Sequence, residues 1–185
     1  YGARLGKSPL RDDRLIKNVH EAFQLEHRLG DPDAYVEFRS RIESDRRKIR
    51  SFIAGEVERG KKVWICQGAS TKGNVLLQYW GLDHRLIEAA SDRSEEKIGK
   101  YTVGTGIPIK SEEEFRKANP DFGLCLTYAF LPEILQREKE WLICGGKLIV
   151  PLPQPRIISA DPKDLELRKY WEPADRIPQL VCTVL

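Results

Sequence analysis

The stretch VWICQGASTKGNVLLQYW, residues 63–80, decides the fold of this chain. Its first four residues form a short apolar run of the kind found in buried strands. Residues 68–74 form a glycine-bounded turn, and the apolar run over 75–80 predicts a helix. A second apolar run over 86–90 ends at Asp92, about 20 residues beyond the turn, as in the first βαβ unit of a nucleotide-binding sheet. We therefore predict that the turn contacts a ligand.

The rest of the chain alternates predicted helices and strands. Ser111 and Glu114 form a capping box that opens one of these helices, and Asn119 with Pro120 ends it. Strands that alternate with helices of this length favour right-handed crossovers and a parallel sheet. The predicted helices cover 14–29, 34–59, 112–118 and 132–142; the further predicted strands cover 86–90, 103–109 at an edge, 122–128 and, as the last one, 147–152; residues 93–101 are a polar loop or short helix.

The predicted fold is therefore α/β, with a Rossmann-like parallel sheet flanked by helices and preceded by two N-terminal helices. We divide the chain into N-terminal helices packing on the core (1–60), a Rossmann-like domain (61–153) and a Pro-rich C-terminal tail (154–185). The apolar end, residues 180–185, either adds a strand to a sheet edge or to a partner chain, or drapes over its own domain. We favour the last of these arrangements.

Composition excludes several classes of protein. Basic and acidic residues alternate and the net charge is only +3, so we expect no nucleic-acid partner. No run is long and apolar enough to span a bilayer. The four cysteines have no CxxC spacing, which indicates reduced thiols in a cytoplasmic protein without a zinc site. The chain starts at Tyr1 and contains no methionine, so we expect further sequence upstream.

The turn departs from two well-known phosphate-binding patterns. Gly68 and Gly73 have P-loop spacing, but Asn74 stands where the lysine should be, and this argues strongly against an ATPase. In a dinucleotide fingerprint Ser70 replaces the second glycine, which disfavours NAD. A helix N-terminus with the hydroxyls of Ser70 and Thr71 and the ammonium of Lys72 nevertheless suits a phosphate or diphosphate. The alternative is a tight strand-to-helix turn with a solvated lysine.

Further candidate residues follow the other strands. Asp92 either accepts hydrogen bonds from a ribose or sugar hydroxyl, or caps the polar segment that follows it. Tyr128 and Phe130 follow the third strand at the carboxyl edge of the sheet, where they either stack on a base or sugar or, for Phe130 above all, pack in the core. The three histidines are scattered without a nucleophile partner, so we assign no catalytic triad.

Several blocks of this sequence resemble one family, the C-terminal domain of SAM-dependent sugar C-methyltransferases. The resemblance runs from about His20 to Pro153, and its blocks come in the same order as in that family. They are GASTKGNVLL (68–77), Asp92-Arg93 through Lys97, GKY (99–101), GTGIPI (104–109) and GGKLIVPLP (145–153). Two departures are the Tyr128-Ala129-Phe130 segment, where the family has Trp followed by His or Asn and then Phe, and Val103, where a proline is usual.

The resemblance implies a domain that binds a nucleotide diphosphate sugar, usually a dTDP-linked ketosugar of deoxysugar biosynthesis. It also implies that SAM, zinc and the catalytic base belong to other domains, or to a partner chain, so we expect a binding module rather than a complete enzyme. Two other hypotheses stay open, a stand-alone NAD(P)-dependent oxidoreductase and a non-catalytic assembly module. The residues that we expect to bind the ligand are Gly68, Ala69, Ser70, Thr71, Lys72, Gly73, Asn74, Asp92, Lys97, Tyr101, Tyr128 and Phe130.

Overall fold

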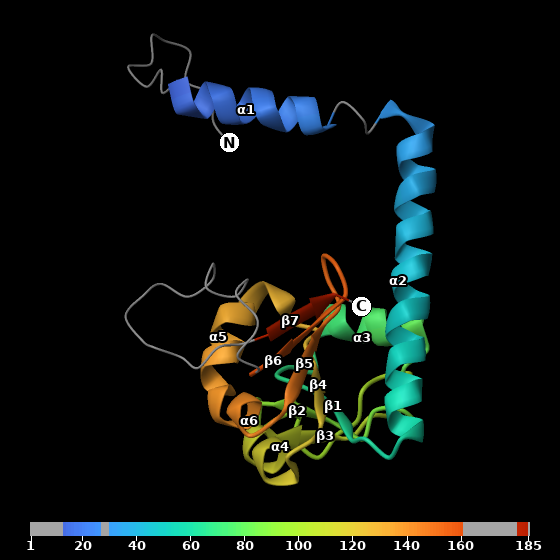
Figure 1. Cartoon of the computed structure of the whole chain (residues 1–185), viewed down its shortest axis with the longest axis vertical. Helices are drawn as coiled ribbons and strands as arrows, with labels where there is room; N and C mark the ends of the chain where they lie inside the picture. The colour runs from blue at the N-terminus through green and yellow to red at the C-terminus, as the bar shows by residue number, and fades with distance from the viewer. Residues whose placement is uncertain (1–12, 27–29, 161–180, 185) are drawn as a thin grey trace. The chain divides into compact units, whose positions relative to one another are not determined.

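The computed structural model of the chain describes residues 13–26, 30–160 and 181–184. The chain divides into two compact units, residues 1–43 and 44–185. Helix α1 (Asp13–Glu26) and the first part of helix α2 (Pro32–Glu58) belong to the first unit. The C-terminal part of α2 belongs to the second unit together with the sheet (Figure 1). The two predicted N-terminal helices are therefore present.

A seven-stranded sheet forms the centre of the second unit. Its strand order is β3-β2-β1-β4-β5-β6-β7, so the chain moves outward from β1 to β3 and then returns to place β4 on the other side of β1. This reversal is the topological switch point at which open α/β sheets bind ligands. The parallel strands are β1 (Val63–Ile65), β2 (Ala89–Asp92), β3 (Ile109–Ser111), β4 (Phe122–Leu124) and β5 (Lys147–Val150); β6 (Arg156–Ser159) and β7 (Val181–Val184) are antiparallel.

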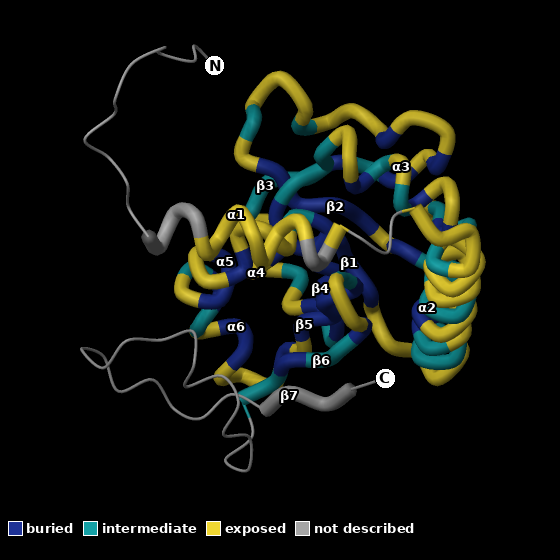
Figure 2. Tube along the Cα trace, turned by 90° about the horizontal axis from the view of Figure 1, so that it is seen from above, coloured by how far each residue is buried: buried dark blue, intermediate teal, exposed yellow. Residues whose placement is uncertain are grey.

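Helices cover both faces of the sheet (Figure 1). Alternation along β1 sends Val63 and Ile65 to the face covered by α2 and α3, and Trp64 to the face covered by α4, α5 and α6. Figure 2 shows the strands in the middle as the most deeply buried part of the unit. The helices not yet given bounds are α3 (Thr71–Trp80), α4 (Glu112–Ala118), α5 (Leu131–Arg137) and α6 (Lys139–Ile143).

Local sequence signals account for two helix ends in this unit. The predicted capping box is present, because the Ser111 hydroxyl accepts from the Glu114 amide at 3.1 Å and the Glu114 carboxylate accepts from the Ser111 amide at 2.9 Å. Asn119 ends α4 in a left-handed conformation with φ 45°. The fold class predicted from the sequence is confirmed, an α/β Rossmann-like sheet flanked by helices.

Several predicted elements differ from the structure in their extent or order. The strand predicted over 86–90 is β2 at 89–92, and the edge strand predicted over 103–109 is β3 at 109–111. The strand predicted to run to Tyr128 ends at Leu124, and a 3₁₀ turn over Tyr128–Phe130 follows, because the chain must leave the sheet to enter α5. The helix predicted over 132–142 is two helices, interrupted at Glu138. The predicted last strand, β5, is followed by β6, which runs antiparallel because the Pro-rich connection 151–155 is too short for a crossover.

The end of the chain adds to the sheet. Strand β7 pairs antiparallel with β6, from Arg156 opposite Val184 to Ser159 opposite Val181. The sheet-edge alternative is therefore the correct one for this segment, and the draped tail that we favoured is not. The prolines at 162, 173 and 178 lie outside the described residues. Across the described ranges, no helix combines the length and apolar character needed to cross a membrane.

Candidate functional site

The turn after β1 is bound tightly to the end of β4. Thr127 Oγ1 donates to the Gln67 carbonyl at 2.7 Å, which joins the two strands on either side of the switch point. Gly68 follows with φ 111°, and a Cβ there would lie 2.9 Å from Thr127 Cγ2. Both the left-handed backbone and the close approach require glycine at this position. The turn therefore has a fixed exit from the sheet.

Helix α3 begins at the turn with a side-chain cap. Ser70 is its N-cap, and the Ser70 hydroxyl accepts a hydrogen bond from the Gly73 amide at 3.0 Å. Gly73 packs directly against Leu126, two residues beyond the end of β4. A Cβ at position 73 would lie 2.9 Å from Leu126 Cβ. The amides of Thr71 and Lys72 have no carbonyl one turn earlier within the helix, so the positive end of the helix faces the turn.

Asp92 joins the turn to the loop after β2. Its Oδ2 accepts from the Ala69 amide at 2.9 Å and from Lys97 Nζ at 3.0 Å, and its Oδ1 accepts from the Ser94 amide at 2.9 Å. Burial raises the pKa of Asp92, but the hydrogen bonds from Ser94 and Lys97 and the charge of Lys97 lower it more, so the pKa lies below its ordinary value. The carboxylate is thus ionised and already has three donors. The Ser94 bond favours the capping alternative over a direct contact with a sugar hydroxyl.

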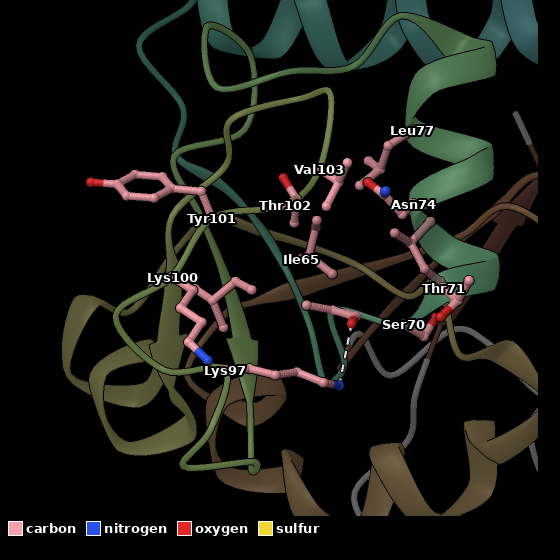
Figure 3. Close-up of a pocket in the computed structure, with 13 residues that line it drawn as sticks. Ile65, Ser70, Thr71, Asn74, Leu77, Lys97, Lys100, Tyr101, Thr102 and Val103 are labelled. Carbon is pink, nitrogen blue, oxygen red and sulfur yellow. Dashed lines mark hydrogen bonds between the residues drawn. The ribbon is translucent and has the colours of Figure 1, made fainter.

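A cavity of about 450 Å³ opens where α3, β1 and this loop meet. Figure 3 shows Ser70, Lys97 and Lys100 toward one end of the group and Val103, Asn74 and Leu77 toward the other, with Ile65 between them. The size is within the range of small-molecule sites. The residues that line it are Ile65, Ala69, Ser70, Thr71, Asn74, Leu77, Lys97, Lys100, Tyr101, Thr102, Val103, Ile109 and Leu126.

The structure brings half of the predicted site residues to this cavity. Those that line it are Ala69, Ser70, Thr71, Asn74, Lys97 and Tyr101; those that do not are Gly68, Lys72, Gly73, Asp92, Tyr128 and Phe130. Lys72 is exposed on α3. Tyr128 and Phe130 are 39% and 58% exposed in the 3₁₀ turn that follows β4. The Tyr101 ring is 67% exposed and points away from the other labelled side chains (Figure 3). A ligand role for each predicted residue stays a prediction.

Lys100, Thr102 and Val103, which the loop contributes to the cavity, were not among the site residues predicted from the sequence. The loop is held by the Thr102 hydroxyl, which lies 2.6 Å from the Thr105 hydroxyl and accepts from the Ile107 amide at 2.9 Å. The sequence signal for this fold-back of the loop is GTG at 104–106, whose glycines adopt φ 76° and 65°. A tight turn there folds the preceding residues back toward α3, where Gln78 Nε2 donates to the Val103 carbonyl at 3.1 Å.

A buried charge network lies beside the switch point. Glu138, in the break between α5 and α6, is 2% exposed, and its carboxylate accepts from Arg116 at 2.7 and 3.0 Å. It also accepts from Gln67 Nε2, at the end of β1. This network fixes the residue that precedes Gly68. Among the residues that the structure describes, no group of three or more His, Cys, Asp or Glu side chains could hold a metal ion.

Comparisons with known proteins bear on the family of this chain. The C-methyltransferase C-terminal domain family matches residues 6–153. The chain is also 44% identical over 127 residues to C-methyltransferase NovU of Streptomyces niveus, an alignment that covers 69% of this chain and 30% of that relative. The chain therefore spans under a third of the relative's length. On these two matches, the chain belongs to the C-methyltransferase C-terminal domain family.

Proposed function

We propose that this chain is the nucleotide-sugar-binding domain of a sugar C-methyltransferase and that its ligand is a dTDP-ketosugar or a close analogue. The observation that carries the proposal is the cavity at the N-terminus of α3, where two lysines and a helix end meet an apolar floor. The resemblance in sequence and the family membership support the methyl-transfer context. The relative NovU is a C-methyltransferase more than three times as long as the matched segment, so we assign SAM binding and the catalytic base to sequence outside this chain or to a partner chain.

Charge favours a diphosphate at the polar end of the cavity. The N-terminal amides of α3 present partial positive charge there, as in many phosphate-binding sites. The Lys97 ammonium is compensated by Asp92, with which it forms a 3.0 Å ion pair. Lys100 lines the same cavity, and within the described ranges no ion pair compensates it. Lys100 therefore supplies the positive charge that an anionic ligand would neutralise.

The geometry of Ser70 makes the oxidoreductase alternative weaker. In a dinucleotide fingerprint, the glycine at this position lets the backbone approach the pyrophosphate closely. Here the Ser70 side chain occupies that position and its hydroxyl accepts from the Gly73 amide. A ligand phosphate would bind beside the cap rather than on the bare backbone. The assembly-module alternative predicts that the chain binds no nucleotide.

Calorimetric titration with dTDP, with NAD and SAM as comparators, tests the proposal. We expect saturable binding of dTDP alone. Lys100→Ala should weaken it by about 1.5–3 kcal/mol, which is the range for a hydrogen bond to a charged group. Lys72→Ala is the matched control, since Lys72 is exposed in the first turn of α3 but does not line the cavity.

The control also tests the earlier assignment of Lys72 to the diphosphate. If Lys72→Ala weakens binding and Lys100→Ala does not, the phosphates lie outside the cavity over the first turn of α3. Binding of NAD in preference to dTDP would contradict the proposed function, and so would the absence of any dTDP binding.

A further inference from the structure

Asn74 carries a buried polar atom that the fold does not use. It lies in α3 and lines the cavity, and its Oδ1 is shielded from solvent. Within the part of the chain that the structure describes, this oxygen has no hydrogen-bond partner. Native proteins keep few such atoms, because an unpaired buried acceptor is destabilising. Asparagine is also a poor helix former. Neither helix formation nor packing accounts for this residue.

The surroundings of Asn74 explain why the oxygen stays unpaired. Figure 3 shows Asn74 at the end of the cavity next to Val103 and Leu77, which offer no donor side chains. The hydroxyl of Thr102, which also lines the cavity, is already engaged with Thr105 and the Ile107 amide. None of these side chains therefore supplies a donor, and a ligand in the cavity can do so. Because the last side-chain torsion of asparagine is broad, a bound ligand needs only to turn the amide for Oδ1 to face the cavity.

We propose that Asn74 recognises the nucleobase of the ligand by accepting a hydrogen bond from a ring N–H, such as the N3–H of thymine. This inference rests on the proposed function and adds a second subsite to it. The apolar lining by Ile65, Leu77 and Val103 fits a flat ring that needs few polar partners. The keto group and remaining hydroxyls of a ketosugar would lose their water without replacement at this end. The polar end, with Lys97 and Lys100, is left for the phosphates.

The test compares two variants with three probes by calorimetry. The variants are Asn74→Leu, which keeps the branched shape and removes the amide, and Asn74→Ala, which cannot clash. The probes are dTDP, its 3-N-methyl derivative and inorganic pyrophosphate. We expect each variant to lose roughly tenfold or more in dTDP affinity, the loss for one hydrogen bond left unmade. Pyrophosphate should bind to the variants as to the unchanged chain.

The methylated probe identifies the N–H directly. It should bind the unchanged chain as weakly as dTDP binds the variants, and it should not distinguish the variants from the unchanged chain. The melting temperature of Asn74→Leu should equal or exceed that of the unchanged chain, because the substitution removes an unpaired buried acceptor. Loss of dTDP affinity without loss of stability is the signature of a ligand-facing role.

Three results would overturn the inference. The first is that either variant binds dTDP as tightly as the unchanged chain does. The second is that the methylated probe binds the unchanged chain as tightly as dTDP does. Equal loss of pyrophosphate and dTDP affinity, together with a lower melting temperature, would show that Asn74 only supports the structure. If the unchanged chain binds neither dTDP nor pyrophosphate, the proposed function falls together with this inference; if it binds pyrophosphate but the variants leave dTDP unaffected, only the inference falls.

Discussion

The effect of Gly73→Ala on stability should show whether close packing against Leu126 outweighs the higher helix propensity of alanine. A Cβ at position 73 would lie 2.9 Å from Leu126 Cβ and 3.0 Å from both Leu126 Cδ1 and Ser70 Oγ. Leu126 Cβ is attached directly to the backbone, so it cannot rotate away and α3 must move from the sheet. Overpacking of this kind costs about 1–3 kcal/mol, whereas alanine gains up to about 1 kcal/mol over glycine in a helix. We expect a net destabilisation of about 1–2 kcal/mol.

Urea denaturation followed by tryptophan fluorescence measures this change. Trp64, Trp80 and Trp141 are all buried in the second unit, so their fluorescence reports on its unfolding. With a slope of about 2 kcal/mol per molar urea, the midpoint should fall by roughly 0.5–1 M. Gly55→Ala is the matched control, because a Cβ there meets nothing closer than Arg59 Nη1 at 4.0 Å. It should stabilise the chain by about 0.5–1 kcal/mol.

The opposite signs of these two substitutions are the test. If Gly73→Ala also raises the urea midpoint, α3 is not held against Leu126 as closely as the structure shows. The turn would then not hold α3 and the cavity in a fixed position. A destabilised variant whose dTDP affinity is also reduced would agree with the proposed position of the ligand beside α3.

Two further predictions concern the charged groups around the site. The pKa of Asp92 in the folded chain lies below its unfolded value of 3.8. The ionised carboxylate therefore contributes stability above pH 3.8, and this stability is lost as the pH falls through the lowered folded pKa. Asp92→Asn should therefore lower the urea midpoint at neutral pH and make the loss of stability below pH 3.8 shallower; an unchanged acid profile would contradict this. Arg116→Ala should destabilise the chain by about 3–5 kcal/mol and Glu138→Gln by about 1–3 kcal/mol. The first variant leaves the Glu138 carboxylate, whose side chain is 1% exposed, without its cation. The second leaves Arg116 without this carboxylate, but the Arg116 side chain is 43% exposed and reaches water. Equal urea midpoints for these two variants would show that burial of the carboxylate is not the deciding factor.

The sequence predicted those parts of the fold that depend on local signals. The strand, turn and helix over 63–80 are present, although α3 begins at Thr71 rather than at Val75. The polar residues 71–74 look like a loop by hydropathy, but the Ser70 cap starts the helix there. The capping box at Ser111 is a similarly local device, and it was predicted correctly.

Long-range pairing could not be predicted in the same way. The direction of β6 follows from a short connection and from the free edge of β5, and the placement of β7 depends on the edge that β6 then provides. The end of β4 is set by where the chain must enter α5, not by the hydropathy of residues 125–128. Lys100 reaches the cavity because the loop folds back through hydrogen bonds of Thr102 and Gln78, which no periodicity reveals.

The predicted turn residues divide between building the cavity and lining it. Gly68 and Gly73 are required because Thr127 and Leu126 approach them closely, and Asp92 is engaged by three donors of the protein itself. The glycines of this turn are thus explained mainly by how β1 and α3 pack at the switch point. Groups with uncompensated charge or unpaired hydrogen-bonding atoms remain available to a ligand, and Lys100 and Asn74 are two of them in this cavity. We therefore expect uncompensated charges and unpaired hydrogen-bonding atoms, rather than membership of a motif, to identify the residues that contact the ligand.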